Sequence, residues 1–151
     1  MSIETKLEEL NINLESLPAR EMLNPVTQTG NLIFTSGQVC AKQGELVSSG
    51  KIGREVTVEE GKKGAEQSII NCLSGLKEYL GDLDKISKIV KVQGFIQSAD
   101  DFTNQRLVMD AASNLLHLIF GEKGKHSRTG VGVNVLPTNA SVEIEMIVEI
   151  K

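Results

Sequence analysis

The sequence predicts a single α+β domain in which a mixed β-sheet is covered on one face by two helices. Two segments show apolar side chains at steps of three and four residues, the spacing of amphipathic helices. Five other segments are rich in β-branched residues or alternate apolar residues with others, as strands do. The segments follow the order β-β-α-β-α-β-β, and 151 residues is the length of one ordinary domain.

Residues 1–16 are expected to form an N-terminal extension, and the domain proper is expected to span residues 17–151. Within the extension, Ile3, Leu7 and Leu10 recur at helical spacing. This spacing predicts a short amphipathic helix.

The first strands of the domain are expected as a hairpin over residues 22–39, because the turn pair Gly30-Asn31 precedes a β-prone run. The polar, glycine-containing residues 41–55 are expected to be a loop. Residues 86–97 carry apolar residues at both odd and even positions, and therefore on both faces of a strand. This pattern is typical of a strand in the interior of a sheet.

The two long helices are expected over residues 58–80 and 104–120. Thr57 and Glu60 have the spacing of a capping box at the start of the first helix. A glycine directly follows each segment, where it can adopt the left-handed conformation that ends many helices.

The C-terminal residues show the clearest alternation. Apolar side chains occupy every second position over residues 131–135 and 142–150, which predicts two half-buried strands. Pro137 suits a turn between them, and a hairpin of these strands would place Gly132 opposite Glu143.

Arg128 is the first candidate for ligand binding, because a guanidinium presents a planar fork of donors that matches a carboxylate. The predicted hairpin places Arg128, Gly130 and Glu143 on the face away from the core, where glycines leave room for a ligand or a second subunit. Glu143 could act there as an acid or base through a water molecule. The simpler alternatives are a salt bridge from Arg128 to Glu145 or Glu149 and a solvated Glu143.

Other candidate groups form weaker patterns. Ser36 and Gly37 could supply a hydroxyl and a backbone N–H to an anion, although the same residues could form a plain turn. His117 and His126 are nine residues apart and fit no metal-binding pattern, so no metal site is expected.

Composition disfavours several classes of function. The net charge is −4 and only five residues are Phe or Tyr, so binding of nucleic acid is not expected. The chain has neither an apolar run long enough to cross a membrane nor a secretory signal pattern, so a cytoplasmic location is expected. Cys40 and Cys72 are too few for a disulfide framework or a thiolate zinc site and are expected to be reduced.

Several spaced motifs, taken in order, resemble the reactive intermediate deaminase family, which is also called the RidA or YjgF-like family. The motifs are Gly30–Gln38, Gly50–Gly53, Asn71–Leu73, Gly94–Ile96, His126–Val133, Leu136-Pro137 and Val142–Glu145. The likeness covers residues 17–151 and is greatest to the long-chain branch of the family, which carries an N-terminal extension.

The resemblance implies a chorismate-mutase-like fold and a homotrimer, with ligand clefts between subunits and with neither cofactor nor metal. Members of the family hydrolyse enamine and imine intermediates released by pyridoxal-phosphate enzymes, which yields 2-keto acids and ammonia. The resemblance further implies that Arg128 holds the carboxylate of the substrate and that Glu143 orders or activates water. Backbone groups around Ser36, Gly37 and Gly130 would complete the pocket.

Three positions depart from the family pattern. Leu23 stands where many members have a tyrosine. Arg106 stands where the family pattern has an asparagine at the start of the second long helix. Gly130 stands where some members have a cysteine. Leu23 and Arg106 are therefore expected as pocket positions at which the substrate preference of this protein differs.

Two functions are consistent with these residues. The first is hydrolysis of small 2-enamino or 2-imino acids, and the second is non-catalytic binding or sensing of a small carboxylate such as a keto acid. The missing tyrosine at Leu23 favours the second. Ribonuclease activity, which is attached to the family by name, is disfavoured by the net charge of −4 and by the lack of a histidine pair for acid–base cleavage.

Overall fold

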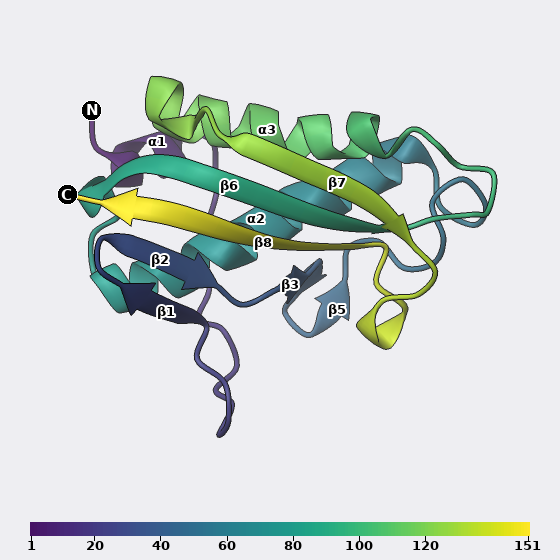
Figure 1. The fold of residues 1–151 in the computed structure, drawn as a ribbon, viewed down its shortest axis with the longest axis horizontal. Helices are drawn as coiled ribbons and strands as arrows, with labels where there is room; N and C mark the ends of the chain where they lie inside the picture. The colour runs from purple at the N-terminus through teal and green to yellow at the C-terminus, as the bar shows by residue number, and fades with distance from the viewer.

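The computed structural model describes residues 1–151 and contains a mixed β-sheet with helices on one face, as predicted (Figure 1). The helices are α1 (Ile3–Glu9), α2 (Val58–Leu80) and α3 (Gln105–Phe120). The strands are β1 (Val26–Thr29), β2 (Leu32–Thr35), β3 (Gln38–Val39), β4 (Ala41–Lys42), β5 (Glu45–Leu46), β6 (Ile86–Gln97), β7 (Ser127–Val133) and β8 (Val142–Ile150). Single 3-10 turns form at η1 (Leu83–Lys85), η2 (Gly121–Gly124) and η3 (Pro137–Asn139).

The predicted first hairpin and both long helices are confirmed. The hairpin consists of β1 and β2, which pair antiparallel around Gly30. At the start of α2, Thr57 and Glu60 form both hydrogen bonds of the capping box. The segment predicted as a loop over residues 41–55 contains an additional short hairpin of β4 and β5. No helix has both the length and the apolar character that a membrane crossing requires.

The strand order is β1-β2-β8-β6-β7, and β3 pairs with β8 beyond the end of β2. The strand β6 therefore lies in the interior of the sheet, as predicted, antiparallel to β8 and parallel to β7. A parallel neighbour can be reached only through a crossover connection, and α3 supplies it. The edge strand β7 is thus placed by the path of α3 over the sheet.

The predicted pairing of the last two strands is wrong. Because β6 lies between them, Gly132 is opposite Ile96, and Glu143 is opposite Phe95. Pro137 begins a 3-10 turn in a connection that passes the end of β6. Alternation defines the two faces of each strand but not its neighbour, and a strand of 12 residues offers both of its edges for pairing.

The register also corrects the face on which Arg128 lies. Residues that are directly opposite in neighbouring strands point to the same face of a sheet. Arg128 and Gly130 are opposite Val92 and Gly94, which are buried beneath the helices. Arg128 therefore faces α3, whereas Glu143 belongs to the alternate set of β8 positions on the open face.

Glycines allow α3 to pack closely on β6 and β7. A Cβ atom on Gly94 would overlap the Sδ atom of Met109, and a Cβ atom on Gly130 would lie 2.7 Å from its Cγ atom. Met109 is completely buried in the trough between these two glycines. This close packing places the next turn of α3 beside Arg128.

The opposite face of the sheet carries no helix and is turned toward the viewer in Figure 1. It exposes large apolar side chains: Phe34 is 40% exposed and Val131 is 42% exposed. Ile147 and Phe95 on the neighbouring strands are half-buried. The single chain thus leaves uncovered a sheet face on which large apolar side chains are exposed.

Candidate functional site

Arg128 is held by two polar side chains of α3. Its Nη1 atom donates to Asp110 Oδ1 at 2.9 Å and to Ser113 Oγ at 3.0 Å. The Nε and Nη2 groups make no hydrogen bond within the chain, and the side chain is 23% exposed. The predicted alternative of a salt bridge to Glu145 or Glu149 is wrong, because both glutamates lie on the opposite face of the sheet.

His126 extends this network. Its Nε2 atom lies 2.9 Å from Ser113 Oγ, and its Nδ1 atom lies 2.6 Å from the carbonyl oxygen of Gly124. Burial lowers the pKa of His126 below its ordinary value, and the positive charge of Arg128 acts in the same direction. The hydrogen bond to Gly124 opposes this shift of the pKa. Burial is the largest of the three effects and favours the neutral imidazole.

An open hollow of about 590 Å³ lies beside the guanidinium. Its lining contains no hydrophobic residue and comes from α3, η2, β7 and the segment between η2 and β7. The lining residues are Ser113, Asn114, His117, Gly124, Lys125, His126 and Arg128. A hollow with such a lining and a partly free guanidinium suits a small polar anion.

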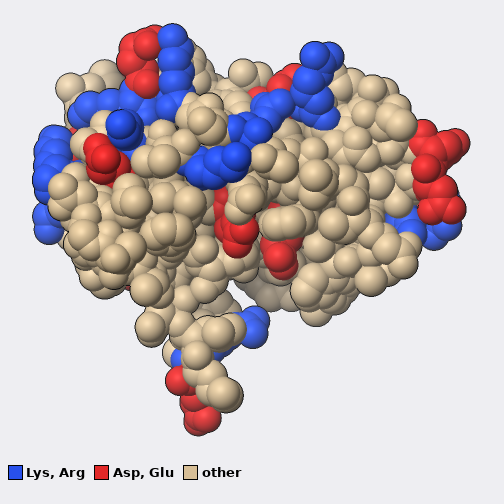
Figure 2. All heavy atoms as spheres, in the orientation of Figure 1, with Lys and Arg blue, Asp and Glu red and all other residues tan.

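Glu143 forms part of a second group of residues, on the open face of the sheet. Its carboxylate lies over Gly37, where a Cβ atom would be 2.9 Å from Oε2. Figure 2 shows acidic side chains in the middle of this face, where β8 crosses it. Burial, and to a lesser degree the charge of Glu145, raises the pKa of Glu143. Glu143 therefore keeps a proton to a higher pH than an ordinary glutamate, which suits acid–base chemistry.

Ser36 directly precedes Gly37 in this second group. The Ser36 hydroxyl donates to the carbonyl oxygen of Asn24 at 2.7 Å, and the Ser36 N–H donates to the carbonyl oxygen of Pro25 at 2.9 Å. The hydroxyl hydrogen is thus engaged within the chain, and the oxygen retains acceptor capacity. Leu23 precedes Asn24 and is 57% exposed. Gly37 is exposed as well.

The two groups are separated within one chain. Arg128 and Glu143 lie on opposite faces of the sheet and are separated by two strand steps and three residues along the strands. Spacings of about 4.8 Å per strand and 3.3 Å per residue put their Cα atoms about 14 Å apart. Arg106 is exposed in the first turn of α3, on the same side of the sheet as Arg128. The expectation that Arg128 and Glu143 share a face is therefore wrong.

Asp110 and Ser113 were missed from the sequence. They belong to a polar stripe that recurs at steps of three and four residues on a helix whose other faces are largely apolar. The stripe consists of Asp110, Ser113, Asn114 and His117. This pattern was visible in the sequence, but its proximity to Arg128 depends on how α3 crosses the sheet.

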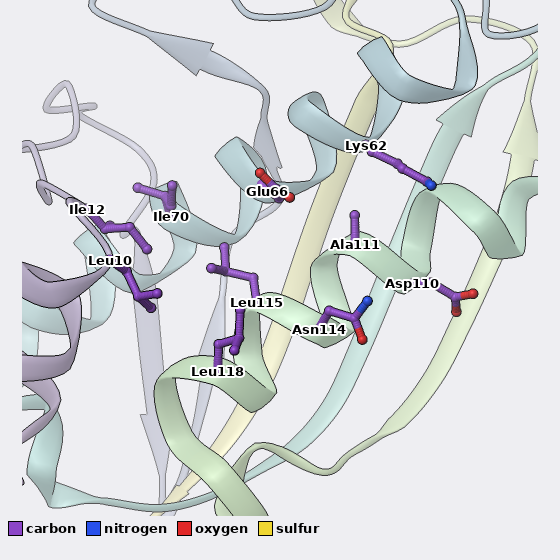
Figure 3. Close-up of a pocket in the computed structure, with 10 residues that line it drawn as sticks. All are labelled: Leu10, Ile12, Lys62, Glu66, Ile70, Asp110, Ala111, Asn114, Leu115 and Leu118. Atoms are coloured by element: carbon purple, nitrogen blue, oxygen red, sulfur yellow. The ribbon is translucent and has the colours of Figure 1, made fainter.

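A second hollow, of about 370 Å³, lies on the outer surface of the helices. Figure 3 shows its ten lining residues, which come from α2, α3 and the segment after α1. Six of them are hydrophobic, and two of the polar ones are already paired: Lys62 with Glu59 and Asp110 with Arg128. Because it lacks a group of convergent free donors, this hollow is a weaker candidate than the one beside Arg128.

Comparisons with known proteins agree with this fold. The family described as "YjgF/chorismate mutase-like, putative endoribonuclease" matches residues 6–150. Protein TCP17 of Trypanosoma cruzi is 34% identical over 98% of this chain and 94% of its own length. A 2-iminobutanoate/2-iminopropanoate deaminase of Dermatophagoides farinae is 34% identical over 82% of each chain. Protein Atu1372 of Agrobacterium tumefaciens, a solved structure of unknown function, superimposes with a TM-score of 0.92 at 42% identity and covers 99% of this chain and 92% of its own.

Proposed function

Since the chain belongs to the YjgF/chorismate mutase-like family, as its motifs predicted, we propose that it hydrolyses small 2-enamino or 2-imino acids to 2-keto acids and ammonia. The observation that carries this proposal is the state of the Arg128 guanidinium. Asp110 and Ser113 hold it at Nη1, whereas Nε and Nη2 remain free beside a polar hollow. A carboxylate accepts two parallel hydrogen bonds from such a pair of donors.

The reaction needs a second group that handles water, and Glu143 has the required chemistry. Water adds its oxygen to C2 of the imine, and the nitrogen leaves as ammonia after it has been protonated. A carboxyl group with a raised pKa can accept a proton from the water and return one to the nitrogen. Anchoring of the carboxylate by Arg128 would hold C2 near this group.

We infer that Arg128 and Glu143 act together across a contact between subunits of a homotrimer. Two features of the single chain support this inference. The two residues lie about 14 Å apart on opposite faces of the sheet. The open sheet face also exposes Phe34 and Val131, and a second subunit would remove these side chains from water. Light scattering would test this assembly, and the expected mass is three times the 16.4 kDa of one chain.

A coupled assay tests the activity. A pyridoxal-phosphate-dependent serine dehydratase generates 2-aminoacrylate, and formation of pyruvate is followed with and without this protein. Arg128→Ala is expected to abolish the acceleration, and Arg128→Lys to restore only part of it, because an ammonium lacks the planar fork. Ser127→Ala is the matched control, because Ser127 is an exposed neighbour without a side-chain hydrogen bond. Full activity of Arg128→Ala would end the proposal.

Non-catalytic binding of a small carboxylate is the second candidate. The observation that favours it is Leu23, an exposed aliphatic side chain that supplies no hydroxyl at a position where many family members have tyrosine. Under this alternative, pyruvate would raise the melting temperature of the protein, but the protein would not accelerate keto-acid formation in the coupled assay.

The charge and the histidines disfavour the ribonuclease activity mentioned in the family description. Cleavage of RNA without a metal needs two groups that exchange protons with the substrate. Both ring nitrogens of His126 are engaged by Ser113 and Gly124, and the net charge of −4 opposes binding of a polyanion.

A further inference from the structure

The hydrogen bonds around His126 have a defined direction. A carbonyl oxygen can only accept, so the bond to Gly124 requires the hydrogen of the neutral imidazole to be on Nδ1. The Nε2 atom then carries a lone pair and accepts from the hydroxyl of Ser113. The oxygen of the same hydroxyl accepts from Nη1 of Arg128. A single directed chain of hydrogen bonds thus runs from Arg128 through Ser113 and His126 to Gly124.

This chain determines which donors of Arg128 are free. The Nη1 atom carries two hydrogens, and Asp110 and Ser113 accept one each. Two bonds from one nitrogen fix the plane of the guanidinium, whereas one bond would leave it free to rotate. Asp110 is 46% exposed, so water can compete for its hydrogen bond with Arg128. The hydrogen bond between Ser113 and His126 is part-buried and is better protected from water.

We propose that Ser113 and His126 are positioning residues, which orient Arg128 for a small carboxylate, and that this orientation requires His126 to be neutral. The proposal rests on the proposed function in one respect, namely that the ligand of Arg128 is a carboxylate. It assigns to two side chains that line the hollow a role that acts on the ligand through Arg128.

Protonation of His126 would reverse the hydrogen bond between His126 and Ser113. The Nε2 atom would become a donor, so the oxygen of Ser113 would face hydrogens from both His126 and Arg128, and its own hydroxyl hydrogen would have to turn away. The imidazolium would also repel the nearby guanidinium. The other titratable groups that line the hollow with His126 are His117 on α3 and Lys125, which directly precedes His126. Two acids are paired with its charged neighbours: Asp110 with Arg128 and Glu122 with Lys125.

The environment keeps His126 neutral near pH 7. Asp110 and Glu122 are already paired with Arg128 and Lys125, so neither acid is free to stabilise an imidazolium. Burial lowers the pKa of His126 below its ordinary 6.5. Binding of a carboxylate is therefore expected to be constant above pH 6.5 and to weaken as the pH falls through the lowered pKa.

NMR of the histidine side chains tests the chain without an activity measurement. The protein has two histidines, and the variant His117→Gln assigns their ring nitrogen signals. At neutral pH, the ring of His126 is expected to carry its hydrogen on Nδ1. A ring with its hydrogen on Nε2 would overturn the proposal, because Ser113 could then no longer donate to it.

Affinity for pyruvate, measured by calorimetry as a function of pH, tests the positioning role. Ser113→Ala and His126→Ala are each expected to weaken binding about tenfold, the effect of losing one hydrogen bond to a charged network. His126→Gln places an amide oxygen that accepts at every pH, so it is expected to retain affinity at neutral pH and to lose the decline at acid pH. Ser127→Ala should match the wild type.

The outcomes distinguish this proposal from the proposed function. If the wild type binds pyruvate but does not accelerate keto-acid formation, hydrolysis is refuted and the positioning role is still measured by affinity. If the wild type does not bind pyruvate, the positioning role is refuted together with the anchoring of a keto acid by Arg128, whichever tautomer His126 adopts. Unchanged affinity and an unchanged pH profile in both Ser113→Ala and His126→Ala would refute the positioning role.

Discussion

Replacement of Gly94 by alanine would place a methyl group inside the side chain of Met109. The new Cβ atom would overlap both Sδ and Cε, whereas ordinary van der Waals contacts begin at 3.4 Å. Met109 is completely buried between α3 and the sheet, so its side chain cannot move into solvent. The variant must therefore displace Met109 or lift α3 away from β6.

Overpacking of this kind costs about 1–3 kcal/mol of unfolding free energy. For a chain of this size, each 1 kcal/mol lowers the melting temperature by about 2–4 °C. Met109→Ala alone is expected to cost about 2–5 kcal/mol, because it leaves a cavity. In Gly94→Ala/Met109→Ala, the new methyl group occupies part of that cavity. The double variant should therefore lose about 1–3 kcal/mol less unfolding free energy than the two single variants lose together.

Urea unfolding followed by circular dichroism would measure all four proteins of this cycle. One protein concentration must be used throughout, because association of subunits changes apparent stability. Additive costs, with no coupling between the two positions, would refute the conclusion that Gly94 exists to make room for Met109.

Three further predictions follow from the surroundings of single residues. Burial raises the pKa of Glu143, so the folded state loses stability as the pH rises from 4.5 through the raised pKa. Glu143→Gln should therefore have a higher melting temperature than the wild type at neutral pH and the same melting temperature below pH 4.5. Cys40 and Cys72 are fully or almost fully buried, and burial raises the pKa of Cys72 to about 12. Neither thiol should therefore react with a thiol reagent at pH 8 until urea unfolds the chain. A Cβ atom on Gly124 would overlap the backbone carbonyl of Leu116, so Gly124→Ala should shift η2 and weaken pyruvate binding as His126→Ala does; wild-type affinity would contradict this.

Local sequence patterns predicted the elements that depend on neighbours along the chain. The capping box of α2, its span over residues 58–80 and the hairpin around Gly30 are all present. The interior strand over residues 86–97 is also correct. These features depend on hydrogen bonds and side-chain spacing within a short segment, so the sequence contains the information that they require.

Glycines explain why the face of Arg128 could not be read from its strand. Gly130 and Gly132 occupy the positions that share a face with Arg128, and glycine has no side chain whose polarity would indicate the core. Val131 and Val133 of β7 point to the opposite face, which also exposes other apolar side chains such as Phe34 in the single chain. Alternation therefore indicated the wrong side.

The sequence by itself determined the succession of helices and strands, the family motifs and the identity of Arg128 and Glu143 as candidates. Only the tertiary structure decided that β6 separates the last two strands and that the two candidates lie on opposite faces of the sheet. The tertiary structure also decided that Ser113 lies next to Arg128 and His126. The physical reason is that α3 can lie close to β6 and β7 only where glycines receive Met109, and this long-range fit sets which side chains of α3 reach the edge strand.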